Sequence, residues 1–223
     1  MLKVPCPNCG AEVVFRSAAL PSRVCDYCQT ILVRRGDGVE AVGKAASLPF
    51  DVSPIQIGTR GTFESHGFEV IGRVRWSWTD GSWNEWLLMF DDGSHGWLGE
   101  AMGQYMMLRE RPLGDIASGA VSLLAAGENV PIGLTAEIDG ETLTAADARE
   151  ATCIASEGEL PFTAPAGWTI YSVDFRSGSG RCASLQREGT TPSFYDGRYV
   201  TLAELAPRNL RAMEGWPMPA FAA

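Results

Sequence analysis

Four cysteines near the start of the chain have the types and spacing that most directly predict chemistry. Cys6 and Cys9 form one C-x-x-C pair, and Cys25 and Cys28 form a second pair further along the chain. A C-x-x-C turn places two sulfur atoms on one side of a tight loop, and a second turn can complete a tetrahedron. The pattern predicts one structural Zn²⁺ ion. Because four thiolates leave no coordination position for water, this zinc is not expected to be catalytic.

Disulfide bonds are the alternative use of these cysteines, and they would need an oxidising compartment. The start of the chain leads directly into Cys6 without the apolar stretch of a signal peptide. No uncharged apolar run approaches the ~20 residues that span a bilayer. We therefore expect a cytoplasmic protein whose thiols stay reduced and bind metal.

The charge balance argues against nucleic acid as the main partner. The formal net charge is -9, from 18 basic and 27 acidic residues, whereas a phosphate-binding surface needs a basic surplus. Arg34 and Arg35 give the N-terminal part a small basic patch, which is a weak electrostatic footprint. Nucleic-acid binding by the zinc ribbon is therefore kept as an alternative. Docking to another protein is the favoured role of the ribbon.

Short strands are the elements that must position these cysteines and build the rest of the chain. Residues 11–15 and 30–33 are strand-like and complete a zinc ribbon, whose folding free energy comes from the metal. Further on, residues 73–78 alternate with period two, and residues 85–90 lead into the turn at 91–94. These patterns predict a meander of short antiparallel strands, as in a small barrel or roll.

A weak internal repeat divides the part after the ribbon into two modules. Ile57-Gly58 opens the first and Ile132-Gly133 the second, and the hairpin sequence Phe90-Asp91-Asp92-Gly93-Ser94 recurs as Phe175-Arg176-Ser177-Gly178-Ser179. The expected fold is mainly β: a small N-terminal zinc ribbon followed by two similar antiparallel β-barrel or roll modules with few short helices. The expected boundaries are 1–38 for the ribbon, 39–52 for a linker, 53–110 for the first module, 111–128 for a connecting segment, 129–211 for the second module and 212–223 for a Pro-rich tail.

Tryptophans concentrate in the first module, and two interpretations of them stay open. Trp76 and Trp78 are separated by one residue, so they share one face of a strand. The cluster can form the core of a small barrel or a recognition surface. Trp83 is expected to be the most exposed, because it follows a turn at residues 80–82. The candidate binding surface comprises Trp76, Trp78, Trp83, Glu85, Trp97, Trp216 and Phe221.

General acid–base chemistry is conceivable for Glu85, His95 and Glu100. The plainer interpretation is that both carboxylates accept backbone hydrogen bonds or pair with Arg73 or Arg75. Neither histidine of the chain lies in a pattern that indicates a triad. No catalytic residue is therefore predicted, and an enzyme of unknown reaction with a site near Glu85, His95 and Glu100 is kept as an alternative.

Several motifs together resemble the bacterial family catalogued as domain of unknown function 4178. They are Gly72-Arg73-Val74, Trp83-x-Glu85-Trp86-x-Leu88, Gly96-Trp97-Leu98-x-Glu100, Gly158-Glu159-Leu160-Pro161-Phe162 and Tyr195-x-Gly197-x-Tyr199-Val200. The resemblance covers about residues 53–211, and an N-terminal zinc ribbon is common in that family. It implies no reaction. It does imply a bacterial accessory protein that works beside small membrane proteins and polyamine-synthesis enzymes, at the membrane face.

The C-terminal tail carries Trp216, Met218 and Phe221 with no charged residue after Glu214. A solvated tail is normally polar, so these side chains are expected to be buried, either against the chain's own modules or in a partner. Taken together, the sequence predicts a non-enzymatic, zinc-stabilised binding or adaptor protein that docks to another protein. It predicts no oligomeric state.

Overall fold

Antiparallel strands make up most of the chain, which confirms the mainly β fold. The structure, a computed structural model, describes residues 1–49 and 51–222. No helix in this described part has the length and apolarity needed to cross a bilayer. The elements are β1 (Leu2–Pro5), β2 (Glu12–Phe15), β3 (Ser22–Val24), β4 (Thr30–Arg35), β5 (Gly38–Lys44), β6 (Arg60–Phe63), β7 (His66–Trp78), β8 (Gly81–Phe90), β9 (His95–Ala101), β10 (Gln104–Arg111), η1 (Leu113–Asp115), β11 (Ile116–Ala117), α1 (Gly119–Ala125), β12 (Thr135–Ile138), β13 (Glu141–Leu160), β14 (Thr169–Arg176), β15 (Arg181–Glu188), β16 (Thr191–Val200) and η2 (Ala220–Ala222).

Eight of these strands close into one antiparallel barrel. Hydrogen-bonded pairs run from β7 through β8, β9 and β10 to β16, and then through β15 and β14 to β13. β13 pairs in turn with β7, which closes the circuit. Closure removes the unpaired edges that an open sheet would expose. The two predicted modules are therefore the two halves of a single barrel.

The two halves, β6–β10 and β12–β16, repeat the same strand order and the same register. Gly58 donates its backbone N–H to the Val70 carbonyl, and Gly133 donates to that of Ala145. The β8–β9 and β14–β15 hairpins both close through a glycine N–H, that of Gly93 and that of Gly180. The equivalent of Gly93 is thus Gly180 rather than Gly178, the glycine that the sequence pattern aligns with it. The repeat predicted from the sequence is a repeat of backbone hydrogen bonding.

A pseudo-two-fold axis relates the halves. In the β7–β13 pair, Ser77 lies opposite Thr152, which is its own equivalent when Gly58 is aligned with Gly133. In the β10–β16 pair, Arg109 lies opposite Asp196, which is its own equivalent when the glycines of the two hairpins are aligned. An axis through both pairs exchanges antiparallel strands, so it runs across the barrel and makes its two ends equivalent in backbone plan.

The second half has a longer connection between its first two barrel strands, and this connection closes one end of the barrel. β7 turns into β8 through a tight hairpin at Thr79 and Asp80, whereas β13 continues to Leu160 and returns through residues 161–168. Phe162 and Trp168 of this loop pack into the interior cluster. One end of the barrel is consequently plugged, and its pseudo-symmetric counterpart is not.

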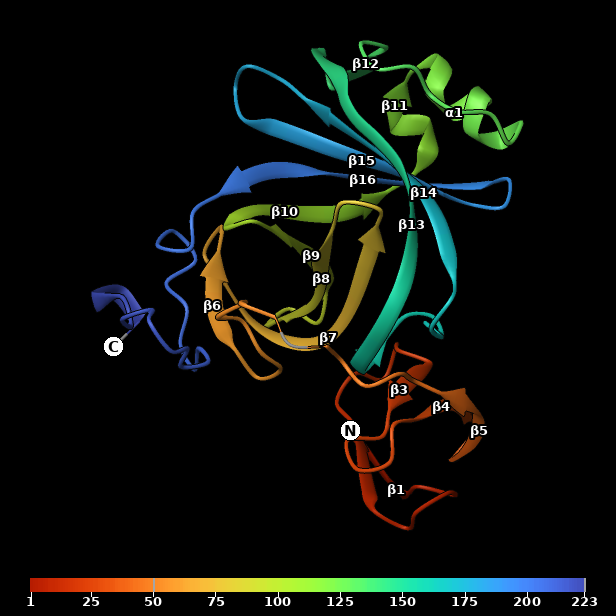
Figure 1. Cartoon of the computed structure of the whole chain (residues 1–223), viewed down its shortest axis with the longest axis vertical. Helices are drawn as coiled ribbons and strands as arrows, with labels where there is room; N and C mark the ends of the chain where they lie inside the picture. Colours follow the sequence, from red (N-terminus) through yellow and green to blue (C-terminus); the bar gives the residue numbers. More distant parts are fainter. Residues whose placement is uncertain (50, 223) are drawn as a thin grey trace.

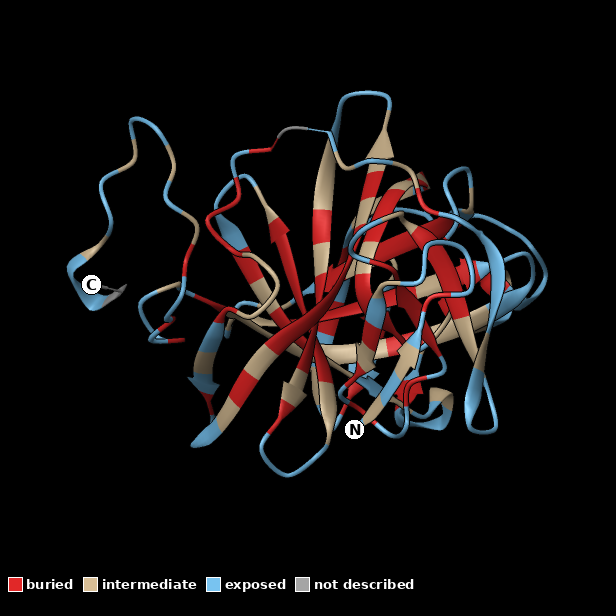
Figure 2. Ribbon diagram, turned by 90° about the horizontal axis from the view of Figure 1, so that it is seen from below, coloured by how far each residue is buried: buried red, intermediate tan, exposed pale blue. Residues whose placement is uncertain are grey.

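Strand alternation gives each half an apolar outer face, and each face is covered. Helix α1 with β11 and β12 packs over the outer face of β13–β16. Segments before β6 and after β16 pack over the outer face of β7–β10. Figure 1 shows α1 at the end of the molecule opposite the N-terminus, and Figure 2 shows buried residues running along the central strands with exposed turns around them.

The N-terminal unit is joined directly to the barrel. β1 pairs with β2, while β3, β4 and β5 form a second small sheet that continues through β3 into β13. The predicted linker, 39–52, is therefore wrong in its first part, because β5 extends to Lys44 and pairs with β4. Residue 50 of that segment and residue 223 of the tail lie outside the described residues.

A buried carboxylate of the barrel anchors the N-terminal unit. Glu159 on β13 is 0% exposed. Its carboxylate accepts the backbone N–H groups of Arg16 and Ser17 at 2.8 and 3.0 Å and the Arg23 guanidinium at 3.2 Å. Leu20 of the same unit packs into the plugged end of the barrel interior. The unit and the barrel therefore share part of a core, whereas the domain boundaries expected from the sequence treat them as separate units.

The tail folds back over the first half. Trp216 packs against the outer cluster of β7–β10, and Arg211 donates to the Ser53 carbonyl at 3.0 Å. Phe221 is 44% exposed. The part of the tail around Trp216 thus lies against the chain's own barrel, whereas Phe221 is exposed.

Candidate functional site

The four N-terminal cysteines lie together at two matching turns. Gly10 donates its N–H to the Cys6 carbonyl at 2.8 Å, and Gln29 donates to the Cys25 carbonyl at 2.9 Å. Both donors have positive φ, 76° and 60°, which the tight turn requires and which glycine adopts at low cost. The two C-x-x-C segments therefore have the same local backbone, as their spacing predicts.

The sulfur positions fit a tetrahedral metal ion. All four Sγ atoms lie within 4.8 Å of one another, with Cys6 and Cys28 at 3.7 Å and Cys9 and Cys25 at 3.8 Å. Two metal–sulfur bonds of about 2.3 Å at a tetrahedral angle separate their sulfurs by about 3.8 Å. Within residues 1–49 and 51–222 this is the one group of cysteine, histidine or acidic side chains close enough to hold a metal.

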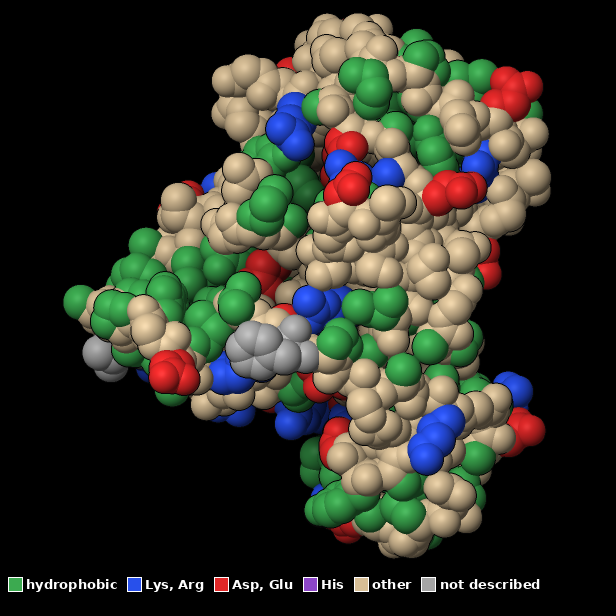
Figure 3. Space-filling view, viewed as in Figure 1, with side chains coloured by type: hydrophobic (Ala, Val, Ile, Leu, Met, Phe, Trp, Pro, Cys, Tyr) green, Lys and Arg blue, Asp and Glu red, His purple; other side chains and the backbone are tan. Residues whose placement is uncertain are grey.

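A second candidate site is a cavity of about 230 Å³ inside the barrel. It lies toward the end that residues 161–168 leave open, and Phe162 and Trp97 form part of its floor, with stacked rings whose centroids are 5.8 Å apart. Figure 3, viewed as in Figure 1, shows acidic and basic side chains together at a hollow in the upper part of the molecule. The lining side chains that matter below are Trp78, Trp83, Glu85, Trp97, Asp147, Arg149, Ser172, Asp174, Arg176, Ser184, Gln186, Tyr195 and Tyr199.

Strand alternation explains how these side chains reach the cavity. Successive residues of a strand point to opposite faces. On β8, Trp83 and Glu85 point inward, while Trp86 packs in the outer cluster. On β14, the side chains of Ser172 and Asp174 point inward, while their neighbours pack under α1. The cavity therefore collects every second residue of strands that are far apart in the sequence.

Glu85 is a buried acid of the cavity whose carboxylate is held by three side-chain donors. Its carboxylate accepts the indole N–H groups of Trp76 at 2.9 Å and Trp83 at 3.1 Å, and the Gln186 amide at 2.9 Å. Burial raises the pKa of Glu85 and outweighs these three bonds, which favour the ionised form. All three donors are neutral, so they orient the carboxylate without cancelling its charge.

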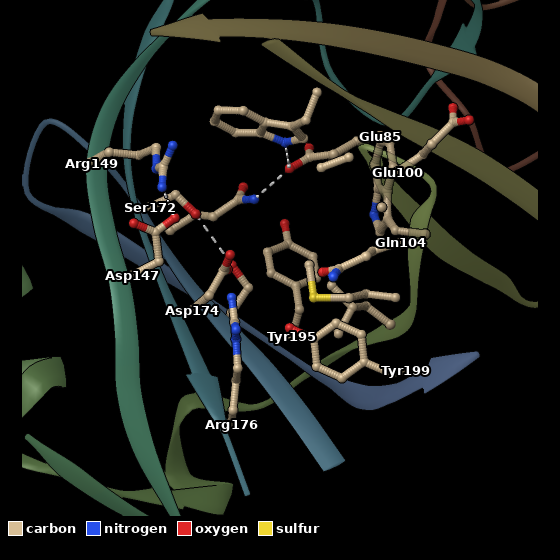
Figure 4. Close-up of a pocket in the computed structure, with 18 of the residues that line it drawn as sticks. Glu85, Glu100, Gln104, Asp147, Arg149, Ser172, Asp174, Arg176, Tyr195 and Tyr199 are labelled. Atoms are coloured by element: carbon tan, nitrogen blue, oxygen red, sulfur yellow. Dashed lines mark hydrogen bonds and ion pairs between the residues drawn. The ribbon is translucent and has the colours of Figure 1, made fainter. Parts of the chain in front are cut away.

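Asp174 is a second buried acid on the opposite half of the cavity. Burial raises its pKa to about 6, and the negative charge of Asp147 adds to this increase, whereas the Ser184 hydroxyl opposes it. Ser172 and Ser184 are within hydrogen-bond distance of each other, at 3.3 Å. Figure 4 shows Glu85 from β8 and Ser172 and Asp174 from β14 reaching toward one space.

Two arginines lie at the rim of the cavity. Arg149 is paired with Asp147, and its guanidinium lies 4.3 Å from the ring centroid of Trp78. Arg176 lies 5.8 Å from the ring of Tyr199. Such stacking is favourable and holds the side chains in place. The rim therefore carries Arg176 and the Arg149–Asp147 ion pair, whereas the buried acids Glu85 and Asp174 lie deeper inside.

The sequence-predicted binding residues separate into three places. Trp78, Trp83, Glu85 and Trp97 line the cavity, so Trp83 points inward rather than into solvent. Trp76 is buried beside them as a donor to Glu85. The remaining two, Trp216 and Phe221, lie in the tail, away from the cavity lining.

The group Glu85, His95 and Glu100 does not form a site. Glu85 faces the cavity, whereas Glu100 borders it with its carboxylate turned to the outer cluster, where Trp86 donates to it at 2.9 Å. His95 lies toward the plugged end, where burial lowers its pKa and the negative charge of Glu159 opposes that shift. Its buried Nε2 atom has no hydrogen-bond partner among the residues that the structure describes. The sequence places the three groups near one another along the chain. In the structure, the Glu100 carboxylate turns to the outer face of the barrel, and His95 lies toward the end of the barrel opposite the cavity mouth.

The polar lining of the second half was missed at the sequence level. Ser172, Asp174 and Arg176 alternate with apolar and aromatic residues along the same strand. This alternation with a period of two was the sequence signal from which the polar lining could have been predicted. The apolar side of the strand packs outward under a helix, so its polar side faces the interior of the barrel. Without the closed barrel, the polar face of this strand reads as a solvent-facing one.

Residues 56–202 match the protein family described as Domain of unknown function (DUF4178). The match spans more than half of the chain and includes both halves of the barrel. No curated protein and no solved structure matches the chain.

Proposed function

Because the chain belongs to the DUF4178 family, whose description names no activity, we propose from the geometry that it is a non-enzymatic binding protein. The barrel cavity takes a small organic ligand, and the N-terminal unit holds a structural Zn²⁺ ion. The observation that best supports this proposal is the cavity of about 230 Å³. One end of the barrel is plugged and the other is open, so the cavity is accessible from a single side.

The lining has the composition of a ligand site. Such sites combine apolar and aromatic walls with a few converging polar groups, and the mouths of barrels are a common place for them. Here Trp78, Trp83 and Trp97 provide the aromatic wall, and Glu85 and Asp174 approach from opposite halves. Ser172 and Ser184 lie beside Asp174, but no histidine that could activate a serine lines the cavity among the described residues, which favours binding over catalysis.

Zinc is the metal that best suits the cysteine cluster. Four thiolates in tetrahedral arrangement are typical of structural zinc, and the closed shell leaves no position for substrate. The cluster also adjoins the segment 16–23, which bonds to Glu159 and packs Leu20 into the plugged end of the barrel. We therefore propose that zinc maintains the closed end of the ligand-binding barrel.

Indole N–H signals of ¹⁵N-tryptophan-labelled protein test ligand entry. Added hexan-1-ol should shift the signals of Trp78 and Trp83 saturably and leave those of Trp86 and Trp216, which lie outside the cavity, unchanged. Gly99 lines the cavity, and a Cβ there meets Met106 only at 3.5 Å, so Gly99→Leu should fill the space without displacing backbone. If Gly99→Leu leaves the shifts intact, or if no cavity signal responds, the proposed site is wrong.

A second candidate function is docking of a protein to the N-terminal unit. Tyr27, between the second pair of cysteines, is 77% exposed, and Val42 on β5 is 46% exposed. Exposed aromatic side chains on a rigid turn are frequent at interface hot spots. A partner that co-purifies with the wild type and is lost with Tyr27→Ala, while zinc content stays the same, would support this role. Retention of every partner by Tyr27→Ala would contradict it.

A further inference from the structure

We propose that the cavity selects an organic ammonium ion, held between Glu85 and Asp174 and against the surrounding tryptophan and tyrosine rings. This inference rests on the proposed ligand-binding function and specifies the class of its ligand.

The first argument is charge. Glu85 on β8 and Asp174 on β14 both face the cavity. Among residues 1–49 and 51–222, neither acid has an ion pair with a lysine, arginine or histidine, although other buried acids do, such as Asp51 with Arg73 and Glu159 with Arg23. Buried charges are normally paired. Arg149 and Arg176 lower the pKa of Asp174 through their charge, but neither forms an ion pair with it. A cation between the two acids would supply the direct ion-pair partner that the described residues do not.

The second argument is that the protein uses neutral donors to keep one carboxylate in place. The Glu85 oxygens accept from Trp76, Trp83 and Gln186, at 2.9 to 3.1 Å. Rigid indole donors fix the carboxylate and leave its negative charge directed toward the space that it lines. An arginine or lysine in any of these positions would have neutralised it. The arrangement is that of a preorganised receptor for positive charge.

The third argument is the wall. Trp78, Trp83, Trp97, Tyr195 and Tyr199 line the same cavity. Aromatic faces attract cations, and quaternary and alkylammonium groups are recognised by clusters of such rings. The same rings accommodate the hydrocarbon part of the ligand. An anion would face two carboxylates in a poorly solvated space, and a neutral ligand would leave both acids without a counter-charge.

The rim restricts where the ammonium group can lie. Arg149 is paired with Asp147 and stacked on Trp78, and Arg176 is at the entrance beside Tyr199. A ligand cation at the rim would meet these guanidinium groups. The inner position between the two buried acids is therefore the favourable one, with the hydrocarbon part directed toward the mouth.

Three ligands of one length separate the head group from the chain. Hexylammonium, hexan-1-ol and hexanoate are titrated into the full-length, zinc-loaded protein, with the Trp78 and Trp83 indole signals and calorimetry as readouts. Hexylammonium should bind about tenfold or more tightly than hexan-1-ol, and hexanoate should be the weakest. If hexan-1-ol binds as tightly as hexylammonium, the ammonium inference fails and the ligand-binding proposal stands. If none of the three shifts a cavity signal, both fail.

Matched variants test the two acids. Glu85→Gln and Asp174→Asn keep the shape of each side chain and remove its charge, so each should lower the ratio of hexylammonium to hexan-1-ol affinity several-fold. Glu137→Gln, on an exposed position of β12, changes the net charge equally and should leave the ratio unchanged. A ratio that survives both cavity variants would overturn the inference. So would a ratio that falls equally with Glu137→Gln, because the effect would then be one of overall charge.

Discussion

At equivalent positions, the first half of the barrel turns Leu87 and Trp97 inward, whereas the second half turns Asp174 and Ser184 inward. The two pairs occupy the same register: Leu87 lies opposite Trp97 on β8 and β9, and Asp174 lies opposite Ser184 on β14 and β15. At these positions one half thus presents apolar side chains to the interior, and the other presents polar side chains on the same backbone plan.

The difference indicates how a repeated scaffold makes an asymmetric site. A strictly symmetric barrel would line both ends of its interior alike. Here the longer β13–β14 connection plugs one end, and polar residues concentrate on the second half, next to the open end. The backbone repeat supplies closure and stability, and substitution at inward positions supplies recognition. The following changes test this comparison from the largest expected effect to the smallest.

Loss of the metal should have the largest effect, because the N-terminal unit is attached to β13 and packs Leu20 into the plugged end of the barrel. Cys25→Ser, which removes one of the four proposed zinc ligands, should release Leu20 and the donors to Glu159. We expect the melting temperature of the whole protein to fall by more than about 10 °C. Circular dichroism measures the melting temperature, and elemental analysis measures the loss of the metal. A barrel whose near-ultraviolet signal and melting temperature stay unchanged in Cys25→Ser would show that the unit is dispensable.

Gly72→Ala tests a position where the two halves differ, because in the first half the backbone of Glu159 passes close to Gly72. A Cβ on Gly72 would lie 1.8 Å from the carbonyl oxygen of Glu159, whereas the equivalent residue of the second half, Asp147, carries a side chain. Backbone must move, so we expect a loss of about 5 kcal/mol in the free energy of unfolding, or failure to fold. Gly99→Ala, with ordinary contacts, is the control. Equal urea midpoints for the two variants would contradict the predicted crowding.

Trp97→Ser gives the first half the residue that the second half has at the equivalent position. Trp97 is 8% exposed and stacks on Phe162, so its removal leaves a large void in the floor of the cavity. The free energy of unfolding should decrease by about 3–5 kcal/mol in urea denaturation. Ser184→Ala, the smaller change in the other half, should cost about 1 kcal/mol. Comparable losses in both would mean that the halves contribute alike.

Asp174→Asn should have the smallest effect and the opposite sign. Burial raises the pKa of Asp174 to about 6, so the folded protein holds this proton over a range where the unfolded chain has released it. Wild-type stability should therefore fall as the pH rises from about 4 to 6, and stay lower above that. At pH 7 the variant should be more stable by on the order of 2 kcal/mol. Urea midpoints of both proteins, measured across this pH range, test the prediction. If the midpoints of the wild type and of Asp174→Asn change with pH in parallel, the prediction is wrong.

Local patterns in the sequence predict the pieces of this structure. The C-x-x-C spacing identifies the cysteine cluster, and alternation in residues 73–78 and 85–90 identifies strands, because both depend on residues close in the chain. The Ile-Gly pairs even predict the repeat, since Gly58 and Gly133 occupy positive-φ positions of the same turn.

Closure of the barrel could not be predicted in the same way. The pairing of Ser77 with Thr152 joins strands from different halves of the chain, and no local signal specifies its register. The cavity follows from that closure, and so do its members Asp174 and Gln186. Likewise, Gly158-Glu159 gives no sequence sign that its carboxylate would accept hydrogen bonds from the N-terminal unit. What depends on long-range pairing became visible only in the structure.

A crystal structure of the zinc-loaded protein grown with hexylammonium tests the central claim most directly. We expect electron density for one ligand in the barrel cavity, with its nitrogen within hydrogen-bond distance of the Glu85 and Asp174 carboxylates and its chain against Trp78 and Trp83. Density for the ligand elsewhere, with the cavity filled by water or by a rearranged tryptophan, would contradict the assignment of this cavity as the ammonium site.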